Sequence, residues 1–216
     1  MRMGELGFQF LSVFIAIVIP LLFLTLMIEN KAGKTVILYC CWGVFAGALA
    51  YNLNMYFSSS TGQWRMIQTV SPLIEELSKG LPLLLFLNRK KYPRIPKLII
   101  YCAFASGIGF SIQESLFHFS LSSQELTDVW MLAVRTLTTS LMHAMTTAAF
   151  GIGLFISQKR RNIMIPLIFG LFALCATLHA LYNLFLQADF VFVAAFMPLV
   201  MFVTGRLFMI CADDME

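Results

Sequence analysis

Eight ionisable side chains lie within, or at the edge of, long apolar stretches of this sequence. A charged side chain at the centre of a bilayer costs at least ~2.5 to 3.5 kcal/mol on insertion scales, so such side chains usually face a cavity or one another. All three histidines of the chain belong to this group, and so do three of its eleven carboxylates. The eight residues are Glu75, Glu76, Lys79, Glu114, His118, Arg135, His143 and His179. They predict a functional site within the membrane.

The spacing of these residues places polar groups on single helix faces. Lys79 follows Glu75 by four residues and Glu76 by three, so its ammonium can pair with either carboxylate but hardly with both. Three further stretches carry small or polar residues at the same spacing. These sets are Gly107, Ser111, Glu114 and His118; Thr139, His143 and Thr146; and Cys175, His179 and Asn183. In the first set, glycine should allow close approach of a neighbouring helix.

The charge balance of the cluster favours a bound cation. Three carboxylates and one ammonium leave two negative charges uncompensated, which a low-dielectric site cannot hold. Either protons are taken up, or a divalent cation binds. Two imidazoles and one carboxylate, with a second carboxylate as general base, form the pattern of catalytic zinc sites. We therefore expect zinc as the cofactor, with His143, His179 and Glu114 as its ligands.

The remaining polar residues have expected roles around this metal. Glu75 or Glu76 would act as general base on a water molecule, and Lys79 would fix the other carboxylate. Asn183 lies one turn from His179 and would orient that histidine or stabilise an oxyanion. A metal-free alternative stays open, in which Glu75 and a histidine share the proton and activate water directly.

The elements that position these residues are predicted to be membrane spans. The 216 residues are 59% hydrophobic and 12% charged, with mean hydropathy +0.82, whereas roughly a quarter of a soluble domain is charged. A helix needs ~20 apolar residues to cross the bilayer. Seven stretches qualify, at 7–28, 35–57, 68–88, 98–119, 129–157, 163–187 and 190–210. The chain is thus predicted to be one all-α, polytopic transmembrane domain over 1–216, with a catalytic core at about 68–187 and no nucleic-acid-binding module.

Basic residues predict the orientation of these spans. Eleven lysines and arginines fall on one side of the membrane and two on the other, so the positive-inside rule predicts an external N-terminus and a cytoplasmic C-terminus in the cell membrane. On this topology the four main site positions (Glu75, Glu114, His143 and His179) lie ~8 to 12 Å below the outer surface. His118 is expected at the rim of the site or behind Glu114, and Arg135 at the membrane interface.

Four motifs on four successive spans resemble those of the PrsW family of intramembrane proteases. They are Glu75-Glu76-Leu77-Ser78-Lys79 (E-E-x-x-K), Phe110 to Glu114 (F-x-x-x-E), His143 followed by Ala144-Met145-Thr146-Thr147, and His179 to Asn183 (H-x-x-x-N). This family belongs to the superfamily of the CAAX prenyl endopeptidases, and Glu114 stands where the prenyl branch carries histidine. The resemblance implies hydrolysis of a membrane-anchored protein near the outer face, as in anti-sigma-factor or stress signalling. The family is described both as metallo- and as glutamic-type.

The alternative from another functional class is a non-catalytic transporter or scaffold with a buried Glu/His cluster. Relays of such residues also serve ion pathways in membranes. A pathway would need polar residues along the whole depth of the bilayer, whereas the predicted cluster lies in one plane. The expected partners are therefore the membrane-anchored protein substrate and the lipid bilayer, with no nucleic acid. A pseudoenzyme that only binds such a substrate is a further alternative.

Overall fold

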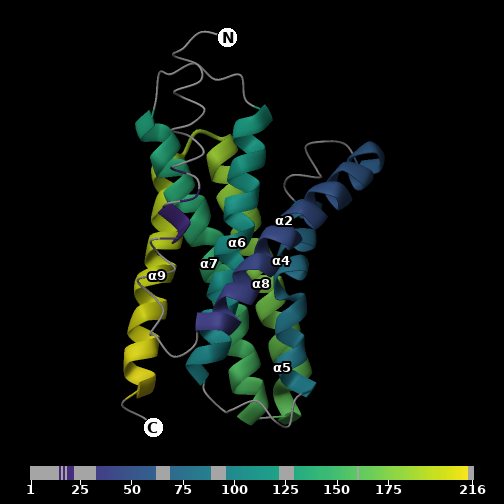
Figure 1. Ribbon diagram of the computed structural model, residues 1–216, viewed down its shortest axis with the longest axis vertical. Coiled ribbons are helices and arrows are strands. Elements are labelled where there is room, and N and C mark those ends of the chain that lie inside the picture. The colour runs from purple at the N-terminus through teal and green to yellow at the C-terminus, as the bar shows by residue number, and fades with distance from the viewer. Residues whose placement is uncertain are drawn as a thin grey trace.

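The structure is a computed structural model that describes residues 15, 17, 19–21, 33–61, 69–88, 96–121, 129–159 and 161–213. Every regular element in these ranges is helical, as predicted (Figure 1). The longer helices are α2 (Gly33–Thr61), α6 (Pro96–Leu121), α7 (Val129–Lys159), α8 (Met164–Gln187) and α9 (Val191–Asp213). The shorter ones are α4 (Ser71–Gly80), η2 (Leu81–Leu84), α5 (Leu85–Asn88) and η4 (Arg161–Ile163).

Four of these helices are long and apolar enough to cross a membrane. Their candidate spans are Gly33–Ser58, Leu98–Phe117, Ala133–Ser157 and Met164–Gln187, and α9 adds a shorter apolar segment at Val191–Leu207. These spans agree with the predicted stretches in the same regions. The predicted first span, 7–28, lies outside the described residues apart from five positions. The count of seven spans and the orientation of the chain stay predictions.

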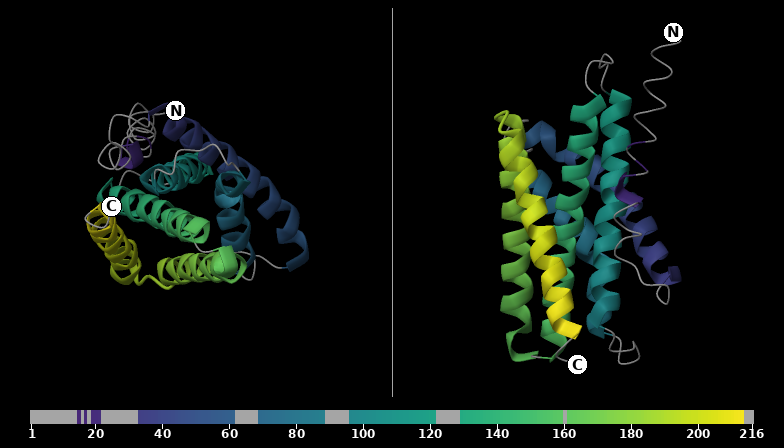
Figure 2. Two further views of the ribbon diagram at one scale, coloured as in Figure 1. Left: turned by 90° about the horizontal axis from the view of Figure 1, so that it is seen from below. Right: turned by 90° about the vertical axis from the view of Figure 1, so that its left-hand side faces the viewer.

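Helix α7 lies at the centre of the described structure, with α6, α4, α8 and α9 around it and α2 on the outer side of α6 (Figure 2). In the candidate spans, 78% of the residues of α6 and 72% of those of α7 are buried, against 28% for α2 and 17% for α8. The buried face of α7 carries hydroxyls and an imidazole. Because lipid offers no hydrogen bonds, such a helix must be enclosed by protein.

Glycines on α6 bring the central helices close together. A Cβ on Gly107 would lie 2.3 Å from the backbone oxygen of His143 on α7. A Cβ on Gly109 would lie 2.0 Å from the backbone oxygen of Cys40 on α2, and one on Gly43 would lie 2.0 Å from the oxygen of Ser106. Such small-residue crossings are typical of packed membrane helices. The predicted close approach at Gly107 thus occurs at the histidine of the site.

The predicted third span is helical from residue 69 to residue 88, but its helix changes to 3₁₀ geometry at Leu81. Pro82 has no N–H, so the carbonyls of Ser78 and Lys79, four and three residues before it, lack a helical donor from this position. Trp42 Nε1 donates to the Ser78 oxygen at 3.0 Å, and Ser106 Oγ donates to the Lys79 oxygen, also at 3.0 Å. Side chains of α2 and α6 therefore supply hydrogen bonds to the two carbonyls at the interruption, as a membrane interior requires.

Candidate active site

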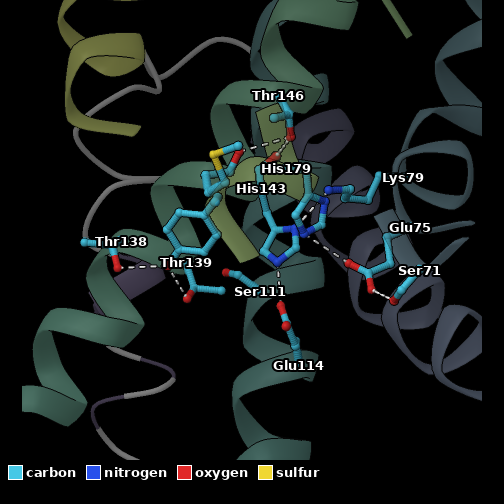
Figure 3. A network of polar contacts seen from close by, with 12 residues as sticks. Ser71, Glu75, Lys79, Ser111, Glu114, Thr138, Thr139, His143, Thr146 and His179 are labelled. Atoms are coloured by element: carbon cyan, nitrogen blue, oxygen red, sulfur yellow. Dashed lines mark hydrogen bonds and ion pairs between the residues drawn. The ribbon is translucent and has the colours of Figure 1, made fainter. Parts of the chain in front are cut away.

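Helices α4, α6, α7 and α8 bring the predicted polar residues into one cluster (Figure 3). Glu75, Glu76 and Lys79 come from α4, and all three are buried together with His143 of α7 and His179 of α8. Glu114 of α6 completes the group and differs from the others, because 43% of its side chain is exposed. The structure therefore unites the four helices that carry the ionisable motifs.

Glu76 is the carboxylate that Lys79 neutralises. Its Oε1 lies 2.6 Å from Lys79 Nζ and accepts a hydrogen bond from Thr146 Oγ1 at 3.1 Å. The same oxygen lies 2.9 Å from Nδ1 of His179. Because a carboxylate paired with a cation only accepts, Nδ1 of His179 carries a proton directed at Glu76, and in the neutral ring Nε2 then presents a lone pair. Glu76 therefore orients His179, as carboxylates behind metal-binding histidines do.

Glu75 is held through one oxygen only. Its Oε1 accepts a very short hydrogen bond from Ser71 Oγ and a longer one, 3.4 Å, from Asn54 Nδ2. Its Oε2 is buried, lies 3.5 Å from Nε2 of His179, and has no hydrogen-bond partner among the residues that the structure describes. An unsatisfied buried carboxylate oxygen costs free energy and is suited to a cation.

Both ring nitrogens of His143 have polar neighbours. Nδ1 lies 2.9 Å from Lys79 Nζ, and Nε2 makes a very short contact with Oε2 of Glu114. With Lys79 charged, Nδ1 accepts from the ammonium, and the ring proton lies on Nε2, directed at Glu114. The ring stands edge-on to His179 at 89°, with centroids 4.8 Å apart. Binding of a cation through Nε2 would replace that proton.

The residues of the cluster fit a metal ion. Glu75, His143 and His179 each offer one ligand atom, and these atoms lie within 4.8 Å of one another. The orphaned oxygen of Glu75 and the lone pair on Nε2 of His179 both belong to this group. The predicted ligand set has Glu114 in place of Glu75, and that carboxylate contacts His143 alone of the two histidines. The structure thus offers two candidates for the carboxylate ligand, Glu75 beside His179 and Glu114 beside His143.

Other predicted residues are not part of the contact network. Asn183 lies half-buried on α8, one turn after His179. Within the described ranges its side chain makes no hydrogen bond to the site. Its neighbour Tyr182 is buried and lies 2.9 Å from the hydroxyls of both Thr138 and Thr139. Arg135 is exposed on α7. The side chain of His118 lies outside the described part of the chain.

Three contributors to the site were not predicted from the sequence. Ser71 and Asn54 hold Glu75, and Tyr182 fixes two threonines of the same α7 face that carries His143. Ser71 is four residues before Glu75, a helical spacing that could have identified it. Asn54 belongs to α2, which carries no carboxylate or histidine, so no sequence signal connects it with the cluster.

Comparison with known proteins gives one match. A family model described as PrsW family intramembrane metalloprotease matches residues 31–207. Neither the curated proteins nor the solved structures yielded a match. The matched region contains all four helices of the cluster and all three carboxylates beside its histidines. Since the match covers most of the chain, this protein belongs to the PrsW family and is an intramembrane protease.

Proposed function

We propose that this protein uses zinc to hydrolyse a peptide bond of a membrane-anchored protein near the outer face of the cell membrane. The observation that carries the proposal is the meeting of Glu75, His143 and His179, three buried groups whose ligand atoms lie within 4.8 Å of one another. A zinc ion held there would polarise the scissile carbonyl and activate water. An anti-sigma factor or another regulator of a stress response is the proposed class of substrate.

The contacts support a division of roles among the carboxylates. Glu76 is occupied by Lys79, Thr146 and His179, which suits an orienting group rather than a base. Glu75, with an orphaned buried oxygen, suits the third ligand. Glu114, with 43% of its side chain exposed, suits the general base. This assignment exchanges the two carboxylates relative to the set expected from the sequence.

In the proposed reaction Glu114 takes a proton from water as the water oxygen attacks the scissile carbonyl carbon. The carbon–nitrogen bond then breaks, and the same carboxyl group returns the proton to the leaving amine. Asn183 stays the proposed oxyanion donor, because it lies one helical turn from His179. The low-dielectric surroundings strengthen each of these electrostatic interactions relative to water.

Amide substitution separates a metal ligand from a general base. We expect Glu75→Gln to lose cleavage of a single-span reporter together with its bound zinc, and Glu114→Gln to lose cleavage but keep the zinc. Zinc is measured by elemental analysis of detergent-purified protein. Asp189→Asn is the matched control, because Asp189 is exposed and its φ of 60° is a conformation that asparagine tolerates. The reverse pattern would reinstate Glu114 as ligand.

A metal-free, glutamic mechanism is the second candidate. It is favoured by the two neighbours of His143, since Lys79 and Glu114 already occupy both ring nitrogens. Activity lost on chelation and restored by added zinc would support the metal. A fully active preparation without metal would leave the glutamate and histidine pair as the catalyst.

A further inference from the structure

A cavity opens between α2 and α6 and reaches both carboxylates of the proposed reaction. Its volume is about 190 Å³, and its lining includes Ala50 and Asn54 of α2, Glu75 of α4, and Gln113 and Glu114 of α6. A cavity needs only roughly 10 to 15 Å³ by this measure to hold one water molecule. The cavity therefore has room for a water and for a larger group beside the two carboxylates.

The oblique course of α2 creates this cavity. Helices α2 and α6 touch backbone to backbone at Gly43 and Gly109. One turn further along α2, a Cβ on Gly47 would lie 2.8 Å from Cβ of Gln113, so glycine makes room for that side chain. Beyond this point α2 still contacts α4 through Asn54, and its C-terminal end projects past the other helices (Figure 1). Asn54, seven residues after Gly47, lies on the side of α2 that lines the opening.

The amide of Asn54 has one end engaged and one end without a partner. Its Nδ2 donates to Ser71 Oγ at 2.6 Å and to Glu75 Oε1 at 3.4 Å. Its Oδ1 is buried and makes no hydrogen bond within the ranges that the structure describes. A buried acceptor without a donor is unfavourable, and Asn54 is a residue of the cavity lining, so its side chain is suited to a ligand that brings an N–H or O–H group.

A membrane-anchored substrate brings such a donor when its helix opens. Within a helix every backbone N–H is bonded to a carbonyl of the same segment. Attack on a peptide carbonyl requires the chain to unwind locally, which exposes N–H groups in surroundings where water is scarce. These groups need acceptors supplied by the enzyme. The Oδ1 atom of Asn54 is an acceptor beside the carboxylates that act on the bond.

We propose that the cavity between α2 and α6 receives the unwound substrate backbone beside the scissile bond, with Asn54 as a positioning residue. Its Oδ1 accepts a hydrogen bond from a substrate N–H, and its Nδ2 holds Glu75 through Ser71. This inference rests on the proposed function. It assigns to α2, which carries none of the four motifs, a part in substrate recognition.

The test combines a change in the enzyme with a change in the substrate. Synthetic single-span substrates carry, one position at a time, an ester in place of a backbone amide beside the scissile bond, which removes one N–H. With the wild-type enzyme we expect one position at which the ester raises KM about tenfold. With Asn54→Leu, KM for the all-amide substrate rises about as much, and the ester at that position has no further effect.

Asn52→Leu is the matched control, because Asn52 is exposed on the same helix and donates to the Ala48 oxygen of its own turn. It should show the wild-type response to the ester. Asn54→Ser is the second variant if Asn54→Leu does not fold. An ester effect that is equal in wild-type and Asn54 variants, or absent at every position, would overturn the inference, because a merely structural asparagine gives no such coupling.

Binding separates this inference from the proposed function. The dissociation constants of the same peptides are measured on the double variant Lys79→Met, Glu76→Gln with and without Asn54→Leu, since neither Lys79 nor Glu76 lines the cavity. If the wild type fails to cleave the all-amide peptide, the proposed function is wrong, and the coupling in the dissociation constants still decides the role of Asn54. If the ester weakens binding only when Asn54 is present, the role of Asn54 is supported. If the ester weakens binding equally with and without Asn54→Leu, that role is contradicted.

Discussion

Lys79 is a fully buried ammonium whose partners come from three helices. Its Nζ pairs with Glu76 at 2.6 Å, lies 2.9 Å from Nδ1 of His143, and stands 4.9 Å from the centroid of the Phe110 ring. The last contact adds a cation–π attraction. Removal of one member of a buried ion pair leaves the other charge uncompensated, which costs more than the pair itself contributes. The stability of the cluster therefore depends on Lys79.

We expect Lys79→Met to lower the free energy of unfolding by roughly 3 to 5 kcal/mol, because the Glu76 carboxylate is left without its counterion. The double variant Lys79→Met, Glu76→Gln should regain most of this loss. Its cleavage of a reporter should remain about tenfold or more slower than that of the wild type, because His179 lacks the carboxylate that orients it. Unfolding in detergent and reporter cleavage measure the two effects. Equal stabilities of the single and double variants would show that the ion pair is not the stabilising contact.

The spacing of residues predicted that Lys79 would neutralise one carboxylate, but not which one. Positions three and four residues away are both neighbours on a helix, so Glu75 and Glu76 were equivalent from the sequence. The choice is made by the surroundings, because Thr146 and His179 supply further donors to Glu76. Such donors come from helices far away in the sequence, and local spacing does not contain them.

The packing of α6 against α7 sets the position of His143. Gly107 lies opposite the backbone of His143, where a Cβ would be 2.3 Å from the carbonyl oxygen. Backbone cannot yield as a flexible side chain can, so any side chain at this position must separate the two helices. The distance between Glu114 on α6 and His143 on α7 depends on this crossing.

Gly107→Ala should therefore destabilise the protein by roughly 1 to 3 kcal/mol and lower kcat for the reporter at least tenfold. Gly170→Ala is the matched control on α8, because in the described part of the chain its added Cβ meets no side chain or neighbouring helix within 4 Å. That variant should be neutral or slightly more stable, since alanine is the better helix former. A Gly107→Ala protein with normal kcat would mean that the crossing does not set the geometry of the site.

The helices themselves were readable from the sequence, but their crossing angles were not. Long apolar stretches predicted α2, α6, α7 and α8 to within a few residues, since span length follows from bilayer thickness. The oblique course of α2, which brings Asn54 to Glu75, depends on glycine contacts between two helices. The third span was predicted as one continuous stretch, and the change to 3₁₀ geometry before Pro82 was missed because hydropathy does not register it.

The molecule as a whole presents apolar side chains outward and keeps its polar groups on the inner helices. Large hydrophobic side chains are exposed on α2, α8 and α9, as expected of surfaces that face lipid. The buried hydroxyls concentrate on α6 and α7, next to the cluster. The arrangement agrees with a membrane protein whose chemistry takes place among its central helices.

We expect the C-terminus and the loop that contains Lys90, which lies outside the described residues, to face the cytoplasm. The reason is that eleven lysines and arginines flank the predicted spans on this side and two on the other side. Reporter fusions at Lys90 and at the C-terminus measure it directly, with a fusion in the loop after α2 as the opposite control. An extracytoplasmic signal at Lys90 would reverse both the orientation and the proposed side of cleavage.

The hydrogen bond between Glu76 and His179 joins residues 103 positions apart, and this separation has a consequence for biogenesis. Helix α4 leaves the ribosome before α7 and α8, so its two carboxylates enter the translocon before either histidine of the site has been synthesised. Lys79 is made three residues after Glu76 and accompanies it into the bilayer as a counterion. It lowers the cost of insertion for a nascent chain that still lacks its catalytic partners. The lysine that stabilises the finished site therefore also stabilises α4 in the bilayer before α7 and α8 are inserted.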